Sequence, residues 1–220
     1  MSTALTVQTV VSMPFAQNSY IVHRQQSPWA LVIDPGMEPE AILSYLDSKQ
    51  LRACAILLTH GHADHIAGVP ALLRHSPEAN IYIGRHEAHM LTDPVANLSR
   101  AFDFDLVVPA ADPSGLLDDG QRLTLDEIEL EVRAIPGHSR GHVVFVIHDH
   151  TPPILFAGDV LFRGSIGRTD FPGGSFEQLR DGIYAKLWTL PDQTLVYPGH
   201  GHSTTIGEEK RSNPFVGGHG

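Results

Sequence analysis

The sequence has a single cysteine, no run of basic residues and no apolar stretch long enough to cross a membrane. Because Cys54 cannot form a disulfide within the chain, a disulfide-stabilised secreted domain is excluded and a reducing cytoplasm is expected. Residues 1–9 also lack the basic and apolar regions of a secretory signal. Cys54 falls in a predicted buried strand, so we expect a small core residue and not a nucleophile.

The balance of charge argues against polyanionic partners. The formal net charge is −10, which disfavours nucleic acid and anionic membrane surfaces. Apolar residues make up 42% of the chain, so extended disorder is not expected. A length of 220 residues suits one large α/β domain over residues 1–220. We therefore expect a small molecule as partner, while the residues indicate no particular oligomeric state.

Hydrophobic patterning predicts strands and helices that alternate along most of the chain. Strands are predicted over residues 7–13, 19–23, 29–33, 53–58, 81–83, 122–125, 128–135, 143–148, 154–157 and 194–197. Helices are predicted over residues 38–50, 66–75 and 175–190, the last beginning with a capping box of Ser175 and Gln178. Residues 85–91 suggest a helical turn that exposes His86 and His89. Residues 92–115 form a long irregular loop that either borders a substrate cleft or is an ordered surface loop.

Histidine is the residue in excess, with 14 in the chain, and three of them stand in one short segment. This segment, T-H-G-H-A-D-H over residues 59–65, follows the apolar strand at residues 53–58. His60 and His62 are two apart, so in an extended segment both imidazoles point the same way. Asp64 and His65 follow where the chain turns. Imidazole and carboxylate together suit zinc, iron or manganese, and a loop of solvated polar residues is the alternative.

Three other predicted strands also end in a possible metal ligand, namely His138, Asp159 and His200. Strands of one sheet system can present their ends on a common rim, so the seven candidates would suffice for two metal ions. A division of three ligands to each ion and one shared carboxylate assigns them all. The first ion takes His60, His62 and His138, the second takes Asp64, His65 and His200, and Asp159 bridges. Asp34, at another strand end, is either a turn former or a hydrogen-bond partner of a metal-bound histidine.

These residues resemble the motifs of the metallo-β-lactamase superfamily. The matching elements are T-H-G-H-A-D-H at residues 59–65, P-G-H at His138 and at His200, and G-D at Asp159. Their order and spacing match across nearly the whole chain. The resemblance implies an α/β (α+β) fold, the four-layer α-β-β-α sandwich of two similar halves, with a dinuclear metal centre along one edge. It also implies the ligand division given above.

Within that superfamily, residues 162–171 resemble the glyoxalase II-like branch, the hydroxyacylglutathione hydrolases. True β-lactamases of the fold typically use a thiolate where Asp159 stands, so lactam hydrolysis is less favoured. Arg168 matches the basic residue of that branch after its G-x-G turn, and His202 replaces its tyrosine two residues after the last metal histidine. Arg168 and His202 are therefore the candidate substrate-binding residues. A salt bridge from Arg168 to Asp170 is the alternative, and His142 and His202 are expected to support the site without ligating a metal.

The glyoxalase II-like branch differs from this chain at the C-terminal end. Glyoxalase II proteins carry a helical C-terminal extension that helps to bind glutathione, and this chain ends about 20 residues after His200. That extension is therefore not expected. The resemblance implies a short glyoxalase II-like thioesterase with a different or broader substrate.

The activity implied by the resemblance is that of a metal-dependent hydrolase. It would cleave a thioester, S-lactoylglutathione or a related acyl thioester, by a metal-bridging hydroxide. The expected cofactors are two divalent metal ions, zinc with iron or manganese as alternatives, about 3.5 Å apart. Asp64 is the candidate catalytic residue, because it is placed to orient the hydroxide. The thiolate leaves without an acid, since thiols are far more acidic than alcohols.

Two rival interpretations come from other functional classes. Persulfide dioxygenases of the superfamily also resemble residues 167–171, use one iron held by two histidines and an aspartate, and consume oxygen. In this chain those ligands would be His60, His138 and Asp159. Alternatively, the metals would only stabilise the fold. This second rival is less favoured, because ligand sets with carboxylates and an open position are typical of catalysis.

Overall fold

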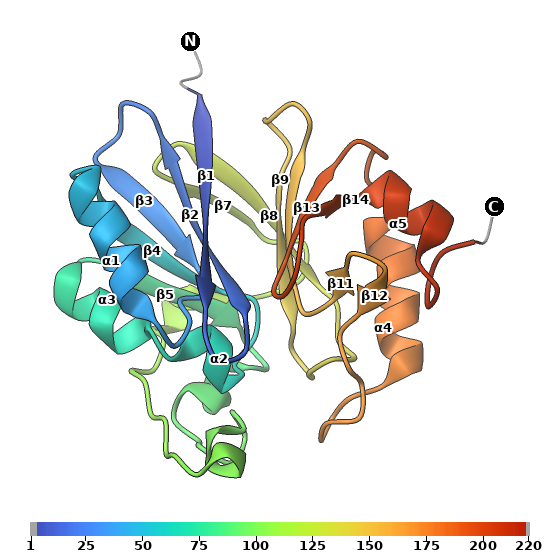
Figure 1. The fold of residues 1–220 in the computed structure, drawn as a ribbon, viewed down its shortest axis with the longest axis horizontal. Helices are drawn as coiled ribbons and strands as arrows, with labels where there is room; N and C mark the ends of the chain where they lie inside the picture. Colours follow the sequence, from blue (N-terminus) through green and yellow to red (C-terminus); the bar gives the residue numbers. More distant parts are fainter. Residues whose placement is uncertain (1–3, 219–220) are drawn as a thin grey trace. The chain divides into compact units, whose positions relative to one another are not determined.

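The computed structural model describes residues 4–218, which form two compact units (Figure 1). The first unit comprises Met1–Ile83, Glu87–Leu116 and Leu125–Glu127, and the second comprises Gly84–His86, Leu117–Thr124 and Ile128–Gly220. The expectation of one domain over residues 1–220 stays a prediction. Among the described residues, no helix has both the length and the apolar character needed to span a bilayer.

The first unit is built on a six-stranded sheet with the order β1-β2-β3-β4-β5-β6. Its strands are β1 (Leu5–Ser12), β2 (Gln17–Arg24), β3 (Trp29–Ile33), β4 (Arg52–Leu58), β5 (Asn80–Gly84) and β6 (Leu116–Leu117). β1, β2 and β3 pair antiparallel, whereas β3, β4 and β5 pair parallel. The carboxyl ends of these three parallel strands therefore share one edge of the sheet.

Two helices supply the crossovers between the parallel strands and cover one face of the first sheet (Figure 1). The helices of this unit are α1 (Pro39–Ser48), α2 (Ala63–Ile66) and α3 (Val69–His75), with 3₁₀ turns η1 (Ala88–Leu91), η2 (Ser99–Phe102) and η3 (Pro113–Gly115). Ile42 and Leu46 of α1 and Leu72 of α3 pack in one core with Val32 and Ile56 of the sheet. Buried apolar side chains on one face of each helix explain this docking.

The predicted helix over residues 66–75 is broken into α2 and α3 at Gly68. The N–H of Gly68 donates to the carbonyl of Pro35 at 2.8 Å. A Cβ at Gly68 would lie 2.7 Å from the carbonyl oxygen of Gly36, which is too close. The close approach of this backbone to the turn after β3 therefore requires glycine and divides the helix.

The second unit is built on another six-stranded sheet, with the order β14-β13-β10-β9-β8-β7. Its strands are β7 (Arg122–Leu125), β8 (Ile128–Ala134), β9 (Val143–Ile147), β10 (Ile154–Gly158), β13 (Leu195–Pro198) and β14 (Thr204–Thr205), and β11 (Leu161–Phe162) pairs with β12 (Ser165–Ile166). β9 is antiparallel to both β8 and β10, and β13 is parallel to β10. The carboxyl ends of β8, β10 and β13 therefore share one edge.

Helices α4 (Phe176–Gly182) and α5 (Ile206–Ser212) pack on the second sheet (Figure 1). The predicted helix over residues 175–190 is α-helical only to Gly182 and continues as a π-helical turn, η4 (Ile183–Leu187). Leu179 of α4 shares a core with Val144 and Val196. The strands β6, β11, β12 and β14 and the helix α5 were not predicted.

Candidate metal centre

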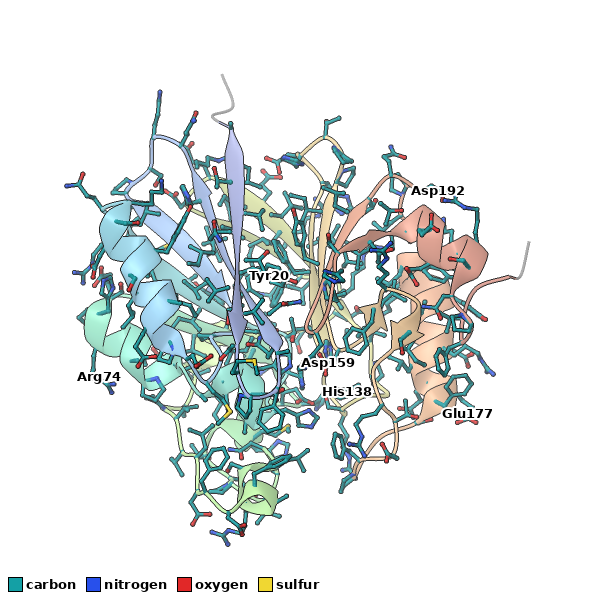
Figure 2. The ribbon with its side chains drawn as sticks, viewed as in Figure 1. Tyr20, Arg74, His138, Asp159, Glu177 and Asp192 are labelled. Atoms are coloured by element: carbon teal, nitrogen blue, oxygen red, sulfur yellow. The ribbon has the colours of Figure 1, made fainter. Side chains whose placement is uncertain are left out.

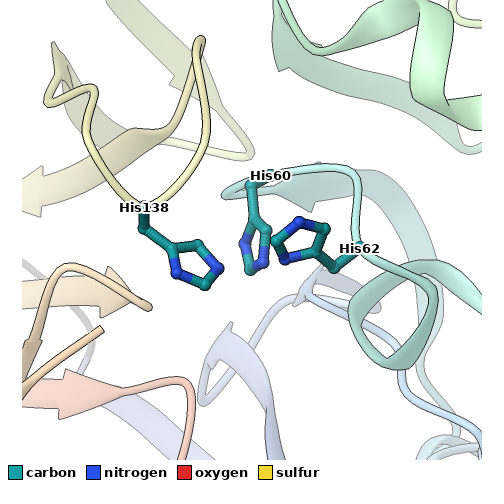
Figure 3. A group of neighbouring side chains, drawn as sticks. All are labelled: His60, His62 and His138. Carbon is teal, nitrogen blue, oxygen red and sulfur yellow. The ribbon is translucent and has the colours of Figure 1, made fainter. Parts of the chain in front are cut away.

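The first group of predicted ligands lies where β4 ends in the first unit. His62 is extended (φ −69°, ψ 148°) and caps α2, so Asp64 and His65 lie in the first turn of that helix. The rings of His60 and His62 are neighbours (Figure 3), with centroids 4.6 Å apart. The centroid of the His60 ring is also 4.1 Å from that of His65. His60 and His65 are fully buried, and ligand atoms of Asp64 and His65 lie within 4.8 Å of each other. The predicted cluster thus exists within this unit.

Asp34 and Thr59 contact the Nδ1 atoms of two of these rings, those of His65 and His60. The Asp34 carboxylate accepts the Thr59 N–H at 2.8 Å and the Thr59 hydroxyl at 2.7 Å, and its Oδ2 lies 3.0 Å from His65 Nδ1. A carboxylate only accepts, so His65 Nδ1 carries the proton and its Nε2 keeps a lone pair for a metal. The Thr59 hydroxyl, which donates to Asp34, can only accept from His60 Nδ1 at 3.1 Å. His60 Nε2 is therefore the second available ligand atom.

Asp34 thus contacts His65, a predicted metal ligand, as one of the two roles predicted for it requires. It also ends β3 in a left-handed conformation, with φ +48°. Aspartate tolerates this conformation better than most residues do. One side chain therefore serves as both turn former and hydrogen-bond partner.

The backbone of the first group is held by residues that the sequence did not indicate. The buried Glu87 accepts the N–H of Gly61 through Oε2 at 3.1 Å. The carbonyl of Asn97 accepts the N–H of Ala63 at 2.9 Å. Both contacts come from the long connection after β5, which carries no motif. They depend on how distant segments meet, so local patterning gives no signal for them.

The second group of predicted ligands lies at the shared edge of β8, β10 and β13. Asp159 follows β10, and its Oδ2 lies 3.6 Å from Nε2 of His138 and 3.6 Å from Nε2 of His200. His138 and Asp159 are neighbours in the second unit (Figure 2). The N–H of Gly199 donates to the carbonyl of Gly158 at 2.8 Å and so ties the ends of two strands together. The structure therefore places one carboxylate between two histidines.

The orientation of this group is also fixed by hydrogen bonds. Nδ1 of His138 lies 2.8 Å from the carbonyl oxygen of Arg168, which can only accept, so Nε2 of His138 is free of its proton. Nε2 of His142 accepts the backbone N–H of Asp159 at 3.0 Å. His142 therefore positions Asp159 through the backbone, as the supporting role predicted for it requires.

Gly167 lies in the segment that resembles the glyoxalase II-like branch, but the sequence predicted no role for it at the ligand groups. A Cβ at this position would lie 1.9 Å from the carbonyl oxygen of Asp159 and 3.2 Å from Nδ1 of His138. No side chain fits there, so glycine lets the loop before Arg168 run directly against both ligands. The only hint in the sequence is the glycine itself.

The two candidate substrate-binding residues lie in exposed loops of the second unit. Arg168 forms a two-pronged pair with Asp170 at 2.7 Å, and its guanidinium stacks on Phe171 at 3.9 Å from the ring centre. This pair lowers the pKa of Asp170 to about 2 and raises that of Arg168. His202 is exposed beyond β13. Substrate binding by Arg168 and His202 stays a prediction, and the alternative salt bridge to Asp170 is present.

The chemistry of the donor set fits a catalytic metal centre. It comprises five imidazoles and two carboxylates, without a thiolate. Such ligands suit zinc, iron or manganese. Asp34 and the Arg168 carbonyl act as outer partners that fix ring orientation, as expected around metal-bound histidines.

Cys54 lies in β4, as predicted, but it is only partly buried and is not the core residue that we expected. Burial raises the pKa of its thiol to about 11. Very little thiolate therefore exists at neutral pH, which agrees with the expectation that Cys54 is not a nucleophile. His86 and His89 are both exposed around η1, as predicted.

Comparison with known proteins identifies the family. The sequence model of the metallo-β-lactamase superfamily matches residues 13–200. Hydroxyacylglutathione hydrolase GloC of Haemophilus influenzae is 34% identical over 212 residues, which cover 96% of this chain and 98% of that protein.

Solved structures agree with this match. The crystal structure of BLEG-1 B3 metallo-β-lactamase has a TM-score of 0.90 at 37% identity and covers 97% of this chain and 100% of that one. TTHA1623 in a di-iron-bound form has a TM-score of 0.81 at 37% identity, with 96% and 100% covered. The predicted fold is therefore confirmed. Because the family match spans most of the sequence and includes all seven predicted ligands, the chain belongs to the metallo-β-lactamase superfamily of metal-binding enzymes.

Proposed function

We propose that the chain is a dinuclear metal-dependent hydrolase that cleaves thioesters, S-lactoylglutathione or a related acyl thioester. The family and the similarity to a hydroxyacylglutathione hydrolase support this reaction class. In the proposal, one ion is held by the three histidines drawn in Figure 3, His60, His62 and His138, and the other by Asp64, His65 and His200. Zinc is the proposed metal, with iron as the alternative because TTHA1623 was solved in a di-iron-bound form.

The observation that carries the proposal is the position of Asp159. Its carboxylate lies 3.6 Å from a ring nitrogen of His138 and 3.6 Å from one of His200. Two carboxylate oxygens can serve two cations, so Asp159 is the proposed shared ligand. The β-lactamases that this family is named for typically have a thiolate at the equivalent place, and this difference favours another substrate.

The proposed chemistry needs few protein groups. When bound, two metal ions would supply hydroxide at neutral pH and stabilise the oxyanion that forms on the thioester carbonyl. Asp64, the half-buried carboxylate of the first group, would accept a hydrogen bond from the attacking water and orient it. The leaving thiol has an ordinary pKa of about 8.5, so it departs as thiolate without a proton donor.

Substrate recognition is proposed for the exposed loops beside the second group. Arg168 presents a fork of donors that could bind a substrate carboxylate once Asp170 releases it. His202, two residues beyond His200, would contact the same substrate. The proposed partner is a small thioester in the cytoplasm. Nucleic acid and membranes are not proposed as partners, because the chain has a net charge of −10.

The test is an assay of purified zinc-loaded protein with S-lactoylglutathione. We expect thioester cleavage, and we expect Asp159→Ala and His62→Ala to lower kcat/KM by at least about 100-fold and to reduce bound metal while the circular dichroism spectrum is retained. His89→Ala removes an exposed histidine outside both groups and serves as the matched control. Normal turnover with full metal content in Asp159→Ala would contradict the shared-ligand assignment.

A second candidate is lactam hydrolysis, which the similarity to BLEG-1 favours. A chromogenic cephalosporin assayed on the same preparation separates the two reactions. Cleavage of the cephalosporin without cleavage of any thioester would overturn the proposed substrate class and leave the metal assignment standing.

A further inference from the structure

The first unit carries three neighbouring apolar side chains that we call the apolar rim, namely the exposed Met13 and Phe102 and the partly buried Phe15. Met13 is 55% exposed and Phe102 is 53% exposed. Phe15 packs edge-on against Phe102, with ring centres 5.0 Å apart and planes at 72°. Large apolar groups held together and left open to water are typical of binding surfaces. Two distant segments, the β1–β2 turn and η2, build the rim jointly.

The segment that carries Phe102 is fixed to the first ligand group. Asn97 accepts the N–H of Ala63, the residue after His62, at 2.9 Å. The buried amide of Asn97 also donates to the carbonyls of Met90 and Leu106, at 3.0 and 2.9 Å, and so holds the loop in shape. The loop that carries Phe102 is therefore held in shape by Asn97 and is hydrogen-bonded to the segment that contains His60 and His62.

The turn that carries Met13 and Phe15 is fixed to the same group from the other side. Gln17, at the start of β2, donates to the carbonyl of Asp34 at 3.0 Å, and the Asp34 carboxylate orients His65. β2 also contacts α2, and Figure 1 draws the β1–β2 turn at the end of the first unit where α2 lies. Both halves of the rim are thus anchored to one ligand cluster.

Three charged groups near the rim, Arg100, Asp105 and Glu38, have partners of their own, and the exposed Asp103 follows Phe102 directly. Arg100 and Asp105 pair with each other through two hydrogen bonds of 2.8 Å. The carboxylate of Glu38 accepts the N–H of Met13 at 2.6 Å. What the rim offers a ligand is therefore thioether and aromatic surface, which favours an apolar group over a charged one.

We propose that the apolar rim binds the acyl group of the substrate and selects thioesters with apolar acyl chains over lactoyl thioesters. This inference rests on the proposed thioesterase function. In the reaction, the oxygen of water bonds to the acyl carbon, the C–S bond breaks and its electron pair leaves on sulfur. The products are a carboxylate and a thiolate, and the two protons of the water pass to solvent. The acyl carbon must lie at the ligand cluster, so its chain extends over the neighbouring surface.

The test uses a series of thioesters of N-acetylcysteamine, a small neutral thiol that removes contributions from the carrier. Acetyl, lactoyl, butyryl and hexanoyl thioesters are compared by kcat/KM. We expect about a fourfold gain for each methylene that reaches the rim, from the free energy of burying one methylene. Phe102→Ala and Phe15→Ala should lower kcat/KM for the hexanoyl thioester at least about tenfold more than for the acetyl thioester.

Two further variants keep the test decisive. Phe102→Leu retains an apolar side chain and should keep most of the chain-length preference, even if Phe102→Ala disturbs the loop. Phe215→Ala removes a phenylalanine that is 51% exposed in the second unit, and it should leave the whole series unchanged. Equal losses for acetyl and hexanoyl thioesters in both Phe102 variants would overturn the assignment of the rim.

Failure of the rim and failure of the proposed function give different results. If wild-type protein cleaves no thioester, the proposed function fails, and calorimetry with the uncleavable S-hexyl-N-acetylcysteamine then tests the rim alone. Binding that Phe102→Ala weakens at least about tenfold would support the rim. If sedimentation shows a dimer and Phe102→Asp dissociates it, the proposal is overturned and the rim is assigned to contact with a second copy of the chain.

Discussion

At the scale of single residues, hydrogen bonds indicate which ring nitrogen is available to a metal in His65 and His138. The Asp34 carboxylate takes the proton of His65 Nδ1, and the Arg168 carbonyl takes that of His138 Nδ1. In both rings the lone pair is left on Nε2. The partners of the ligands are therefore as important for the proposed site as the ligands themselves.

Asp34→Asn tests this dependence. The amide keeps the size of the side chain and tolerates the left-handed backbone at this position, but it removes the charge that faces His65 and Thr59. We expect a loss of about 10- to 100-fold in metal affinity, measured by competition with a chromophoric chelator. Asp103→Asn makes the same change at another residue with positive φ, at the end of η2, where no hydrogen bond to a predicted ligand is at stake, and should bind metal as the wild type does. Equal affinities in both variants would refute the role of Asp34.

Cys54 gives a prediction about pH. Its native pKa is raised to about 11, so the folded chain keeps the thiol proton at pH values where the unfolded chain, with a value near 9.0, has lost it. This contribution to stability is complete below about pH 9 and is lost as the pH rises towards 11. At pH 8, iodoacetamide should modify native Cys54 roughly 100-fold more slowly than the urea-unfolded chain, as followed by mass spectrometry. Equal rates would show that the thiol is not protected.

At the scale of elements, helix caps are a local feature that the sequence reports well. Ser175 caps α4, and its Oγ accepts the N–H of Gln178 at 3.3 Å. This is one half of the predicted capping box, because the N–H of Ser175 donates to the carbonyl of Gly137 at 2.8 Å. Ser175→Ala should lower the free energy of unfolding by about 1 kcal/mol in urea titrations. Ser212→Ala, at the exposed end of α5, removes a hydroxyl that only donates to the carbonyl of Glu208 and should change stability less. A larger effect for Ser212→Ala would contradict this account of the cap.

Patterning predicted the long elements and missed the short ones. β4 and the helix over residues 39–48 have clear apolar periods, whereas β11, β12 and β14 have two residues each and carry no period. The helix α5 does have a local signal, since Thr205 accepts the N–H of Glu208 in a T-x-x-E capping arrangement. The break at Gly68 is different, because it arises from contact with a distant turn.

For the candidate site, too, local sequence predicted some residues and missed others. His60, Asp159 and His200 stand at the ends of apolar strands, so sequence alone could predict them as ligands. Glu87 and Asn97 hold the first group from a loop without a motif, and their roles follow only from tertiary contacts. Local sequence thus predicts the candidate ligands, and the fold decides how they are held.

At the scale of the whole molecule, each unit offers one group of ligands at the carboxyl ends of its strands. If both groups bind the same pair of ions, metal removal must destabilise the native chain, because the ions bind folded protein and not unfolded protein. Saturating metal at about 100 times its dissociation constant would contribute about 2.7 kcal/mol. We expect a chelator to lower the Tm and added zinc to restore it. An unchanged Tm would contradict shared ligation.

The most direct test of the central claim combines a metal count with two activity assays on one purified sample. Elemental analysis gives metals per chain, and the same protein is assayed for thioester cleavage and for oxygen uptake with a glutathione persulfide. Two ions per chain with thioester cleavage and no oxygen uptake is the predicted result. One iron per chain with oxygen uptake would contradict it and support the dioxygenase instead.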